Sequence, residues 1–327
     1  MLMSVEQAAS LIQSGKALSI AGDKQLLAAL PKGQWIGGTI PYFVDESGGV
    51  HTRDRLFVTE VPTFAEAVRI QTYAVDALPD IASDAPDNGY TLLILPAASE
   101  VHLRYAHDAP GYPGLFMKQI VGWIAGVDLA EIGADKALVF DGRTGASHAA
   151  HAIAMHVSLP SNRYAQIGIV NCFQQGAGDA ISFPEDGFVV DACEVNGVPR
   201  RFADYLAEIK ADTRLPLVAD YNGVAVNVSI QSVAEDHSKV DLYAPVFQNV
   251  VYKFAEPIGD YVNAFAAQVS DAQSANGFSC NCILNYLYGG LEGRRVGGFT
   301  GPVTFGEIAY QLLNQTLVYL QIEELPQ

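Results

Sequence analysis

The chain has 327 residues, of which 50% are apolar and 17% are charged, so it can bury a large core and is not disordered as a whole. Its 19 basic and 36 acidic residues give a formal net charge of −17, which argues against nucleic acid and anionic membrane surfaces as partners. No apolar run approaches the roughly 20 residues that a membrane-spanning helix needs, and the first residues do not resemble a secretory signal.

The first half of the chain predicts helices and strands in alternation. An amphipathic helix is entered from Ser4, and Asp23 can cap a second helix. Apolar residues recur at helical spacing in Phe64–Tyr73, and the segment Leu115–Ile124 follows a loop rich in Pro and Gly. The predicted helices after the first are Lys24–Leu30, Phe64–Tyr73 and Leu115–Ile124, and Tyr90–Pro96 is predicted to be a buried strand.

The second half is mainly β in pattern. Strand-like segments between residues 137 and 195 are separated by turn residues, and Val195-Asn-Gly-Val198 is a strong hairpin signal. An amphipathic helix is predicted over Ile258–Gln273, with strands over Phe278–Cys282 and Thr316–Ile322. We therefore expect an α+β or α/β protein with mixed β-sheets and flanking helices.

An internal repeat suggests that the two halves of the chain are homologous. Residues 19–39 align with residues 279–299 without a gap, and Gly37-Gly38 then meets Gly297-Gly298. Both copies follow the order strand, apolar segment, glycine, strand. Because ligand sites favour the interfaces between domains, the repeat predicts a site between the two halves.

Four short motifs near the C-terminus are distinctive. They are Phe278-Ser-Cys280, Val296-Gly-Gly-Phe299, Phe305-Gly-Glu-Ile308 and Asn314-Gln-Thr-Leu-Val318. In this order they resemble the C-terminal part of the FIST (F-box and intracellular signal transduction) sensory domain. The layout is similar over roughly residues 215–325, and more loosely in the N-terminal half through Trp35-Ile-Gly-Gly-Thr39 and the strand Tyr90–Pro96. The resemblance divides the chain into a FIST N-like domain, residues 1–205, and a FIST C-like domain, residues 206–327.

The resemblance implies a sensory module of intracellular signal transduction that binds a small ligand, amino acid-like or haem, in a cleft between its halves. A signalling protein partner would carry the output. The ligand is expected near the turn from Gly297 to Glu307 and near the matching Gly37–Gly38. The full set of expected ligand-binding residues is Gly37, Gly38, Cys280, Asn281, Gly297, Gly298, Glu307 and Asn314. The step Cys280-Asn-Cys-Ile283 departs from the pattern of the family, so the chemistry of the pocket is left open.

A second class of function stays open beside binding, namely an enzyme that uses Glu307 or Cys280 in the same cleft. The Gly-x-Ser-x-Gly elbow, the phosphate loop and the glycine spacing of a dinucleotide-binding turn are all absent from the sequence. A cysteine nucleophile would also need a neighbouring base, which the sequence does not place. No catalytic residue is therefore assigned.

The histidines do not predict a metal site. His148, His151 and His156 have spacings that fit no single helix face. His102 and His107, near a loop rich in Pro and Gly, are better candidates for a haem or ligand contact, since one axial histidine suffices for haem.

The cysteines suggest a reducing compartment. Cys172, Cys193, Cys280 and Cys282 are too few and too irregularly spaced for a disulfide framework, so we expect a cytoplasmic protein with reduced thiols. Two glycosylation sequons, which begin at Asn227 and Asn314, would have no role in that compartment.

Overall fold

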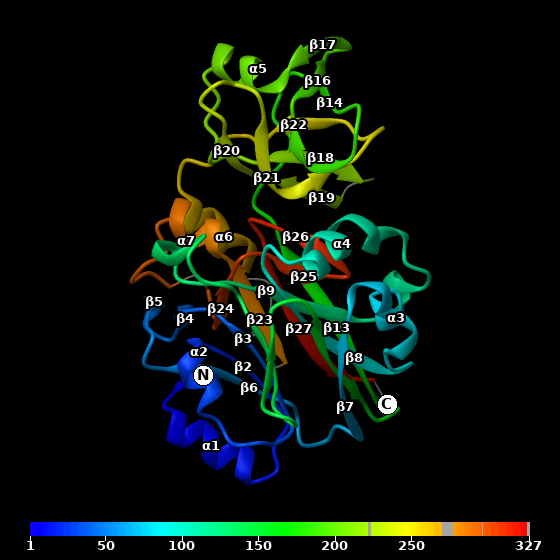
Figure 1. The fold of residues 1–327 in the computed structure, drawn as a ribbon, viewed down its shortest axis with the longest axis vertical. Coiled ribbons are helices and arrows are strands. Elements are labelled where there is room, and N and C mark those ends of the chain that lie inside the picture. The colour runs from blue at the N-terminus through cyan, green and yellow to red at the C-terminus, as the bar shows by residue number, and fades with distance from the viewer. Residues whose placement is uncertain (222–223, 270–276, 296, 326–327) are drawn as a thin grey trace.

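The computed structural model describes residues 1–221, 224–269, 277–295 and 297–325, which form a body and an upper lobe (Figure 1). The upper lobe comprises residues 174–256, and the body comprises the described residues on either side of it. The chain enters the upper lobe after β13 (Arg163–Val170) and returns to the body before α6 (Tyr261–Val269). The upper lobe is thus an insertion between two segments that both belong to the body.

The body contains three mixed β-sheets, each with one parallel pair of strands that a helical crossover joins. The first sheet, in the order β1-β6-β2-β3-β10-β11, consists of β1 (Leu2–Met3), β6 (Leu56–Glu60), β2 (Leu18–Gly22), β3 (Trp35–Thr39), β10 (Val139–Asp141) and β11 (Ala146–His148). The second, β26-β25-β9-β8-β12-β7, consists of β26 (Gln311–Leu313), β25 (Glu307–Ala309), β9 (Ile120–Ala125), β8 (Gly89–Pro96), β12 (Ala152–Ser158) and β7 (Ala67–Tyr73). The third, β13-β27-β23-β24-β4-β5, consists of β13, β27 (Leu317–Glu324), β23 (Phe278–Cys282), β24 (Gly301–Thr304), β4 (Tyr42–Asp45) and β5 (Gly48–His51).

The described residues of the upper lobe form a six-stranded antiparallel sheet, a three-stranded antiparallel sheet and one helix. One sheet, β17-β16-β14-β22-β18-β19, consists of β17 (Val198–Arg201), β16 (Ala192–Val195), β14 (Ile181–Ser182), β22 (Tyr252–Phe254), β18 (Leu217–Tyr221) and β19 (Val224–Val228). The other, β15-β21-β20, consists of β15 (Gly187–Val190), β21 (Val240–Val246) and β20 (Ile230–Val233). The helix is α5 (Phe202–Glu208).

Helices flank the sheets of the body, and local capping explains where several of them begin. The Ser4 hydroxyl accepts from Gln7 N, and the Gln7 side chain accepts from Ser4 N, which completes a capping box. Asp23 accepts from Gln25 N at the start of the next helix. The α-helices of the body are α1 (Val5–Gln13), α2 (Lys24–Ala28), α3 (Asp80–Asp84), α4 (Glu100–Asp108), α6 and α7 (Ile283–Tyr288), and the 3-10 turns are η1 (Val75–Ala77), η2 (Ala109–Gly111), η3 (Leu115–Met117) and η4 (Leu129–Glu131).

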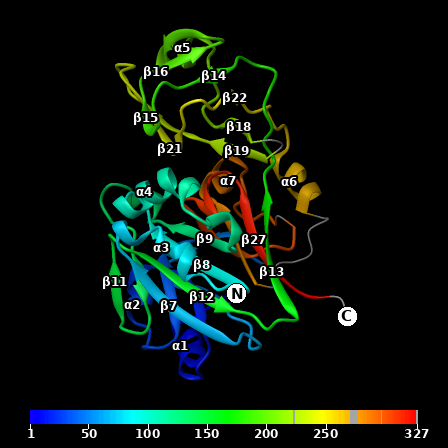
Figure 2. The same ribbon diagram turned by 90° about the vertical axis from the view of Figure 1, so that its right-hand side faces the viewer.

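The core of the body forms on both faces of the second sheet, because every residue of β8 is buried. Leu92 and Ile94 pack in the cluster that joins all three sheets, whereas Leu93 and Leu95 pack in a second cluster, which includes residues of α3 and α4 and extends into the upper lobe. Alternation of side chains along a strand places these two pairs on opposite faces. Figure 2 shows α3 and α4 next to β8 and β9. The second sheet is therefore the central layer of the body.

The expected fold class is confirmed, since the structure is α+β with several mixed sheets and flanking helices. The predicted hairpin at Val195–Val198 is also present. Asn196 and Gly197 have φ of 52° and 79°, the two positive values that a type I′ turn requires. The helix predicted over Ile258–Gln273 is α6, and residues 270–273 lie outside the described part of the chain.

Two predicted helices are wrong. Phe64–Tyr73 contains the strand β7, in which Ile70 and Tyr73 are buried three residues apart and so imitate helical spacing. Leu115–Ile124 contains one 3-10 turn and then β9, which pairs in parallel with β8. In both segments, β-branched residues favour a strand. The backbone hydrogen-bond partners come from β12 for β7 and from β8 for β9.

The two copies of the internal repeat adopt similar local structures. Residues 19–39 span β2, α2 and β3, and residues 279–299 span β23 and α7 and end just before β24. β2 and β3 are parallel neighbours, and so are β23 and β24, the strand that follows the second copy. However, Gly37-Gly38 lies inside β3, whereas Gly297-Gly298 precedes β24. The predicted homology of the halves stays a prediction, as does the division into FIST-like domains at residues 205/206, a position that lies inside α5.

None of the described helices is both long enough and apolar enough to cross a membrane.

Candidate functional site

A cleft of about 1170 Å³ lies between the upper lobe and the body. Its upper wall is formed by β18, β19 and the residues at the end of β21, and its lower wall by α4, η3 and the hairpin of β25 and β26 (Figure 1). Its volume slightly exceeds the few hundred to about 1000 Å³ that is usual for small-molecule sites. We call it the inter-lobe cleft.

The described lining of the inter-lobe cleft is almost uncharged. Asp220 is its one ionisable carboxylate, and neither Lys, Arg nor His occurs in it. The polar lining consists mainly of amide side chains, and the remainder is apolar or aromatic. The amide side chains are Asn171, Gln174, Gln175, Asn227, Gln268 and Gln311, and the large apolar and aromatic ones include Phe116, Ile169, Phe173, Tyr221, Phe247 and Tyr310.

The deep end of the cleft is closed by a pair of asparagines. Asn171 follows β13 of the body, and Asn227 lies in β19 of the upper lobe. Each Nδ2 donates to the other residue's Oδ1 at 3.0 Å. Asn227 Nδ2 also lies 3.1 Å from the carbonyl oxygen of Asn314, to which it donates. Because the pair connects the body to the upper lobe, it fixes the position of the cleft walls at this end.

Asn314 and Gln315 extend this connection behind the cleft. The Ser229 backbone N–H and hydroxyl lie 3.1 Å and 2.6 Å from Asn314 Oδ1, and the same hydroxyl lies 2.6 Å from Gln315 Oε1. All three side chains are buried. The predicted site residue Asn314 therefore lies one layer behind the cleft wall, where it holds β19 in place.

Glu307 is the centre of a buried polar cluster beside the same wall. Thr316 donates to Glu307 Oε2 through its hydroxyl at 2.8 Å and through its backbone N–H at 3.3 Å. Thr304 Oγ1 lies 3.4 Å from Oε1. The side chain of Glu307 is fully buried, and Ala309, two residues further along β25, lines the cleft.

Burial raises the pKa of the Glu307 carboxyl to about 8, although hydrogen bonds from Thr316, Cys282 and Thr304 act in the opposite direction. At neutral pH the carboxyl is therefore mostly protonated. Thr304 Oγ1 lies 2.9 Å from the carbonyl oxygen of Gly306, which takes its single proton. The Thr304 oxygen can then accept from a protonated Oε1. The geometry thus fits a neutral acid that donates one hydrogen bond, to Thr304, and accepts two from Thr316 and one from Cys282.

Cys280 and Cys282 are buried beside Glu307. Cys280 Sγ lies 3.4 Å from the carbonyl oxygen of Gly122, to which the thiol donates. Burial raises the pKa of both thiols well above the ordinary value, and the nearby Glu307 acts in the same direction. Since the thiolate is the nucleophile, neither cysteine is activated in this conformation. The other predicted residue of this strand, Asn281, accepts from Asn285 Nδ2 at 2.9 Å.

The predicted glycines lie away from this cluster. Gly37 and Gly38 are inside β3, where a Cβ on Gly38 would lie 2.6 Å from the ring of Trp123. Gly297 and Gly298 line a hollow of about 100 Å³ beside Asp45 and Arg295. The structure thus brings Cys280, Asn281, Glu307 and Asn314 together near the cleft, and places the two glycine pairs elsewhere.

A second cleft, of about 600 Å³, opens on another side of the same junction. It shares Phe173 with the inter-lobe cleft and reaches the Glu307 cluster through Asn285 and Gln315. Its walls are more polar and carry charges of both signs. The charged lining residues are Asp212, Arg214, Asp260 and Arg294.

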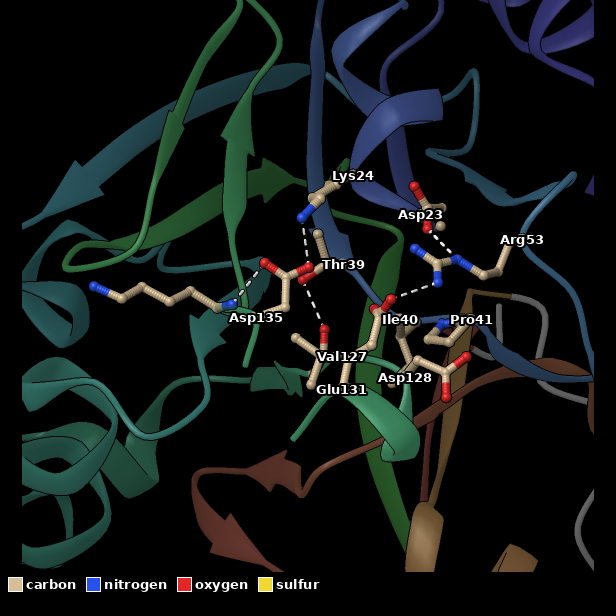
Figure 3. A pocket seen from close by; sticks show the side chains of 13 residues that line it. Asp23, Lys24, Thr39, Ile40, Pro41, Arg53, Val127, Asp128, Glu131 and Asp135 are labelled. Carbon is tan, nitrogen blue, oxygen red and sulfur yellow. Dashed lines mark hydrogen bonds and ion pairs between the residues drawn. The ribbon is translucent and has the colours of Figure 1, made fainter. Parts of the chain in front are cut away.

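A third pocket lies where β2, β3 and β9 end, and Figure 3 shows its charged lining. Arg53 bridges Asp23 and Glu131 at 2.7 and 2.8 Å, and Lys24 pairs with Asp135. The remaining space is about 20 Å³, enough for roughly one water molecule. These ion pairs fill the pocket, so we interpret it as a structural feature.

The histidines remain outside both clefts. His148 and His151 have ring centroids 5.1 Å apart, but among the described residues no group of three side chains could hold a metal ion. His102 is buried in α4 against Phe188, and burial lowers its pKa to about 4. Of the side-chain types that ligate haem iron, the described lining of the inter-lobe cleft offers only tyrosines, so it fits haem poorly.

Sequence reasoning missed Asn171, Asn227 and Ser229. A signal was present, because asparagine is uncommon within strands and Asn227 interrupts the apolar run of β19. The sequence singles out Asn227 only as part of a glycosylation sequon, and Asn314 both as part of a sequon and as an expected ligand-binding residue, yet the two bond to each other. Their pairing could not be deduced, since they are 87 positions apart.

Residues 3–323 match a family of unknown function, DUF6976, and because this match covers nearly the whole chain, the protein belongs to that family. No curated protein is similar enough to this chain to count as a relative.

Proposed function

We propose that this protein binds a small ligand in the inter-lobe cleft and acts as a sensor. The observation that carries the proposal is a cleft of about 1170 Å³, formed by two lobes, with amide and apolar side chains in its described lining. Sites at domain interfaces with a few polar groups among apolar ones are typical of ligand binding. A ligand that contacts both walls would favour one arrangement of the lobes, which is how binding is converted into a signal.

The resemblance of the C-terminal motifs to the FIST sensory domain supports the same proposal. It adds the expectation of an amino acid-like ligand and of a signalling protein that receives the output. A cytoplasmic location is part of the proposal and is supported by the four free cysteines, which are usual in reducing compartments.

A thermal-shift screen against amino acids, small acids, nucleotides and haem tests the proposal. A ligand at about a hundred times its dissociation constant adds about 2.7 kcal/mol, which raises the melting temperature by several degrees. The hit is then repeated with Ile169→Trp, which fills the cleft from a position that is 41% exposed. Val189→Trp, exposed and outside the cleft lining, is the matched control.

The proposal predicts that Ile169→Trp abolishes the shift and that Val189→Trp preserves it. A panel without any hit, or a hit that both variants retain equally, would count against the inter-lobe cleft as the ligand site.

A second candidate function is an enzyme that uses Glu307, and the observation that favours it is the raised pKa of this carboxyl. Strongly shifted pKa values are concentrated at functional sites. Incubation of the hit from the screen, followed by mass spectrometry, separates the two functions. A product that wild-type protein forms and Glu307→Gln does not form would favour the enzyme.

A further inference from the structure

Two open sheet edges face each other across the inter-lobe cleft. β19 is the terminal strand of its sheet in the upper lobe, and β26 is the terminal strand of the central sheet of the body, as far as the described residues show. Residues 224–228 of β19 line the cleft, and so do residues 309–313, which comprise the last residue of β25, the turn at Tyr310 and β26. Consecutive side chains of a strand point to opposite faces of the sheet. Consecutive residues of β19 can therefore all line one cleft when the hydrogen-bonding edge of this strand faces the cleft.

The hydrogen bonds of the asparagine pair confirm this direction. The carbonyl oxygen of Ala225 lies 3.1 Å from Asn171 Nδ2, which donates to it from outside the pairing of β18 with β19. The Asn314 carbonyl oxygen, one residue beyond β26, accepts from Asn227 in the same way. In an antiparallel strand, the N–H and C=O of one residue point to the same side. The Ala225 N–H therefore points toward the cleft as well.

At the deep end of the cleft, side-chain amides thus take the position of a neighbouring strand. A primary amide offers the same donor and acceptor as a peptide group, and Asn171 uses it to bond the backbone of β19. The rest of the cleft repeats this chemistry with Gln174, Gln175, Gln268 and Gln311. A ligand with several peptide groups would extend the pattern along both edges.

The charge of the cleft points to the same class of ligand. The described lining contains no cation, and the whole chain carries a net charge of −17, so phosphates and carboxylates lack a counter-charge there. Peptide groups are uncharged and need none. Phe116, Ile169 and Val224, which are 53%, 41% and 57% exposed, provide apolar contacts for the side chains of such a ligand.

From these observations we infer that the inter-lobe cleft binds an extended, uncharged peptide segment that adds to the β19 edge as a further strand. This inference rests on the proposed ligand-binding function of the cleft and names the class of ligand. In this mode of recognition the main chain of the peptide provides affinity, and pockets for alternate side chains provide selectivity.

The test uses fluorescein-labelled acetyl-Val-Thr-Val-Thr-Val-amide as the probe and fluorescence anisotropy as the readout, with full-length protein. Ala225→Pro removes the outward N–H and leaves the ladder with β18 in place, because proline is tolerated on edge strands. Ala225→Ser keeps the N–H and is the matched control. We expect Ala225→Pro to weaken binding about threefold to tenfold, the effect of losing one net hydrogen bond, and Ala225→Ser to bind as wild type does.

A second measurement is independent of whether Ala225→Pro folds. The same peptide, methylated on every backbone nitrogen, keeps its side chains and loses its donors, so we expect wild-type protein not to bind it. Equal affinity for the methylated and unmethylated peptides would overturn the inference, as would unchanged binding by a folded Ala225→Pro variant.

The small-molecule screen separates this inference from the proposed function. If the peptide does not bind up to 1 mM (roughly −4 kcal/mol of binding free energy) but a small molecule binds and is excluded by Ile169→Trp, the peptide inference fails and the ligand-binding cleft stands. If neither binds, both fail. If the peptide binds and Ile169→Trp excludes it while Val189→Trp does not, both are supported.

Discussion

Asn171 and Asn227 exchange two hydrogen bonds of 3.0 Å, and this reciprocal amide pair joins the body of the protein to its upper lobe. Asn227 is almost fully buried, while Asn171 also bonds the backbone of Ala225. An amide pair carries no charge, so its strength does not depend on pH or on salt. This part of the junction between the lobes is therefore held by neutral hydrogen bonds. Elsewhere in the junction, His107 Nε2 of α4 lies 3.6 Å from Asp186 Oδ2 of the upper lobe.

We predict that Asn227→Ala lowers the free energy of unfolding by about 1–3 kcal/mol, because it leaves the buried carbonyl of Asn314 without its donor. Urea denaturation measures this change, and Asn162→Ala at an exposed position is the control. In a double-mutant cycle, Asn171 and Asn227 should show a coupling of about 0.5–3 kcal/mol. Additive single effects would contradict a pair that acts as one unit.

A second prediction concerns Glu307, whose pKa in the folded protein is about 8 against 4.5 for the free side chain. Between these values the folded state holds a proton that the unfolded state has released, so stability falls as pH rises from about 4.5 to 8. Glu307→Gln removes this titration. Gln can also donate to Thr304 and accept from Thr316, which matches the protonated acid.

We therefore expect the free energy of unfolding of Glu307→Gln, relative to wild type, to increase from pH 5 to pH 8 with a slope of up to about 1.4 kcal/mol per unit. The lowered pKa values of His102, His156 and the Met1 amino group act oppositely, but they are common to both proteins and cancel in the difference. Glu66→Gln, at an exposed site, is the control. Parallel curves for Glu307→Gln would mean that the carboxyl is ionised in the folded protein.

A third prediction separates a packing role of Gly38 from a role in binding. A Cβ at this position would lie 2.6 Å from Trp123 Cη2 and 2.8 Å from Ile94 Cγ2. Gly38→Ala should therefore lower the free energy of unfolding by about 1–3 kcal/mol, as overpacking does. Gly178→Ala, where no heavy atom lies within 4 Å of the new Cβ, is the control. Weaker ligand binding by Gly38→Ala without any loss of stability would instead assign Gly38 to the ligand site, as the sequence suggested.

The local part of the fold could be predicted from the sequence. Ser4 and Asp23 begin helices, and Asn196-Gly197 forms the hairpin, because each feature depends on residues within a few positions of one another. Phe64–Tyr73 and Leu115–Ile124 could not be assigned by the same means. Their state is decided by β12 and β8, which are distant in sequence and supply the backbone hydrogen-bond partners.

The sequence by itself determined the class of the fold, the short distance along the chain between Cys280 and Glu307, and the excess of acidic residues that disfavours anionic ligands. Only the tertiary structure decided that Glu307 is buried, that Gly37-Gly38 packs inside a sheet, and that Asn227 faces Asn171 at the junction of the lobes. The physical reason is that burial and amide pairing depend on which surfaces meet. Which surfaces meet is decided by contacts between residues more than fifty positions apart, and no local sequence pattern predicts such contacts.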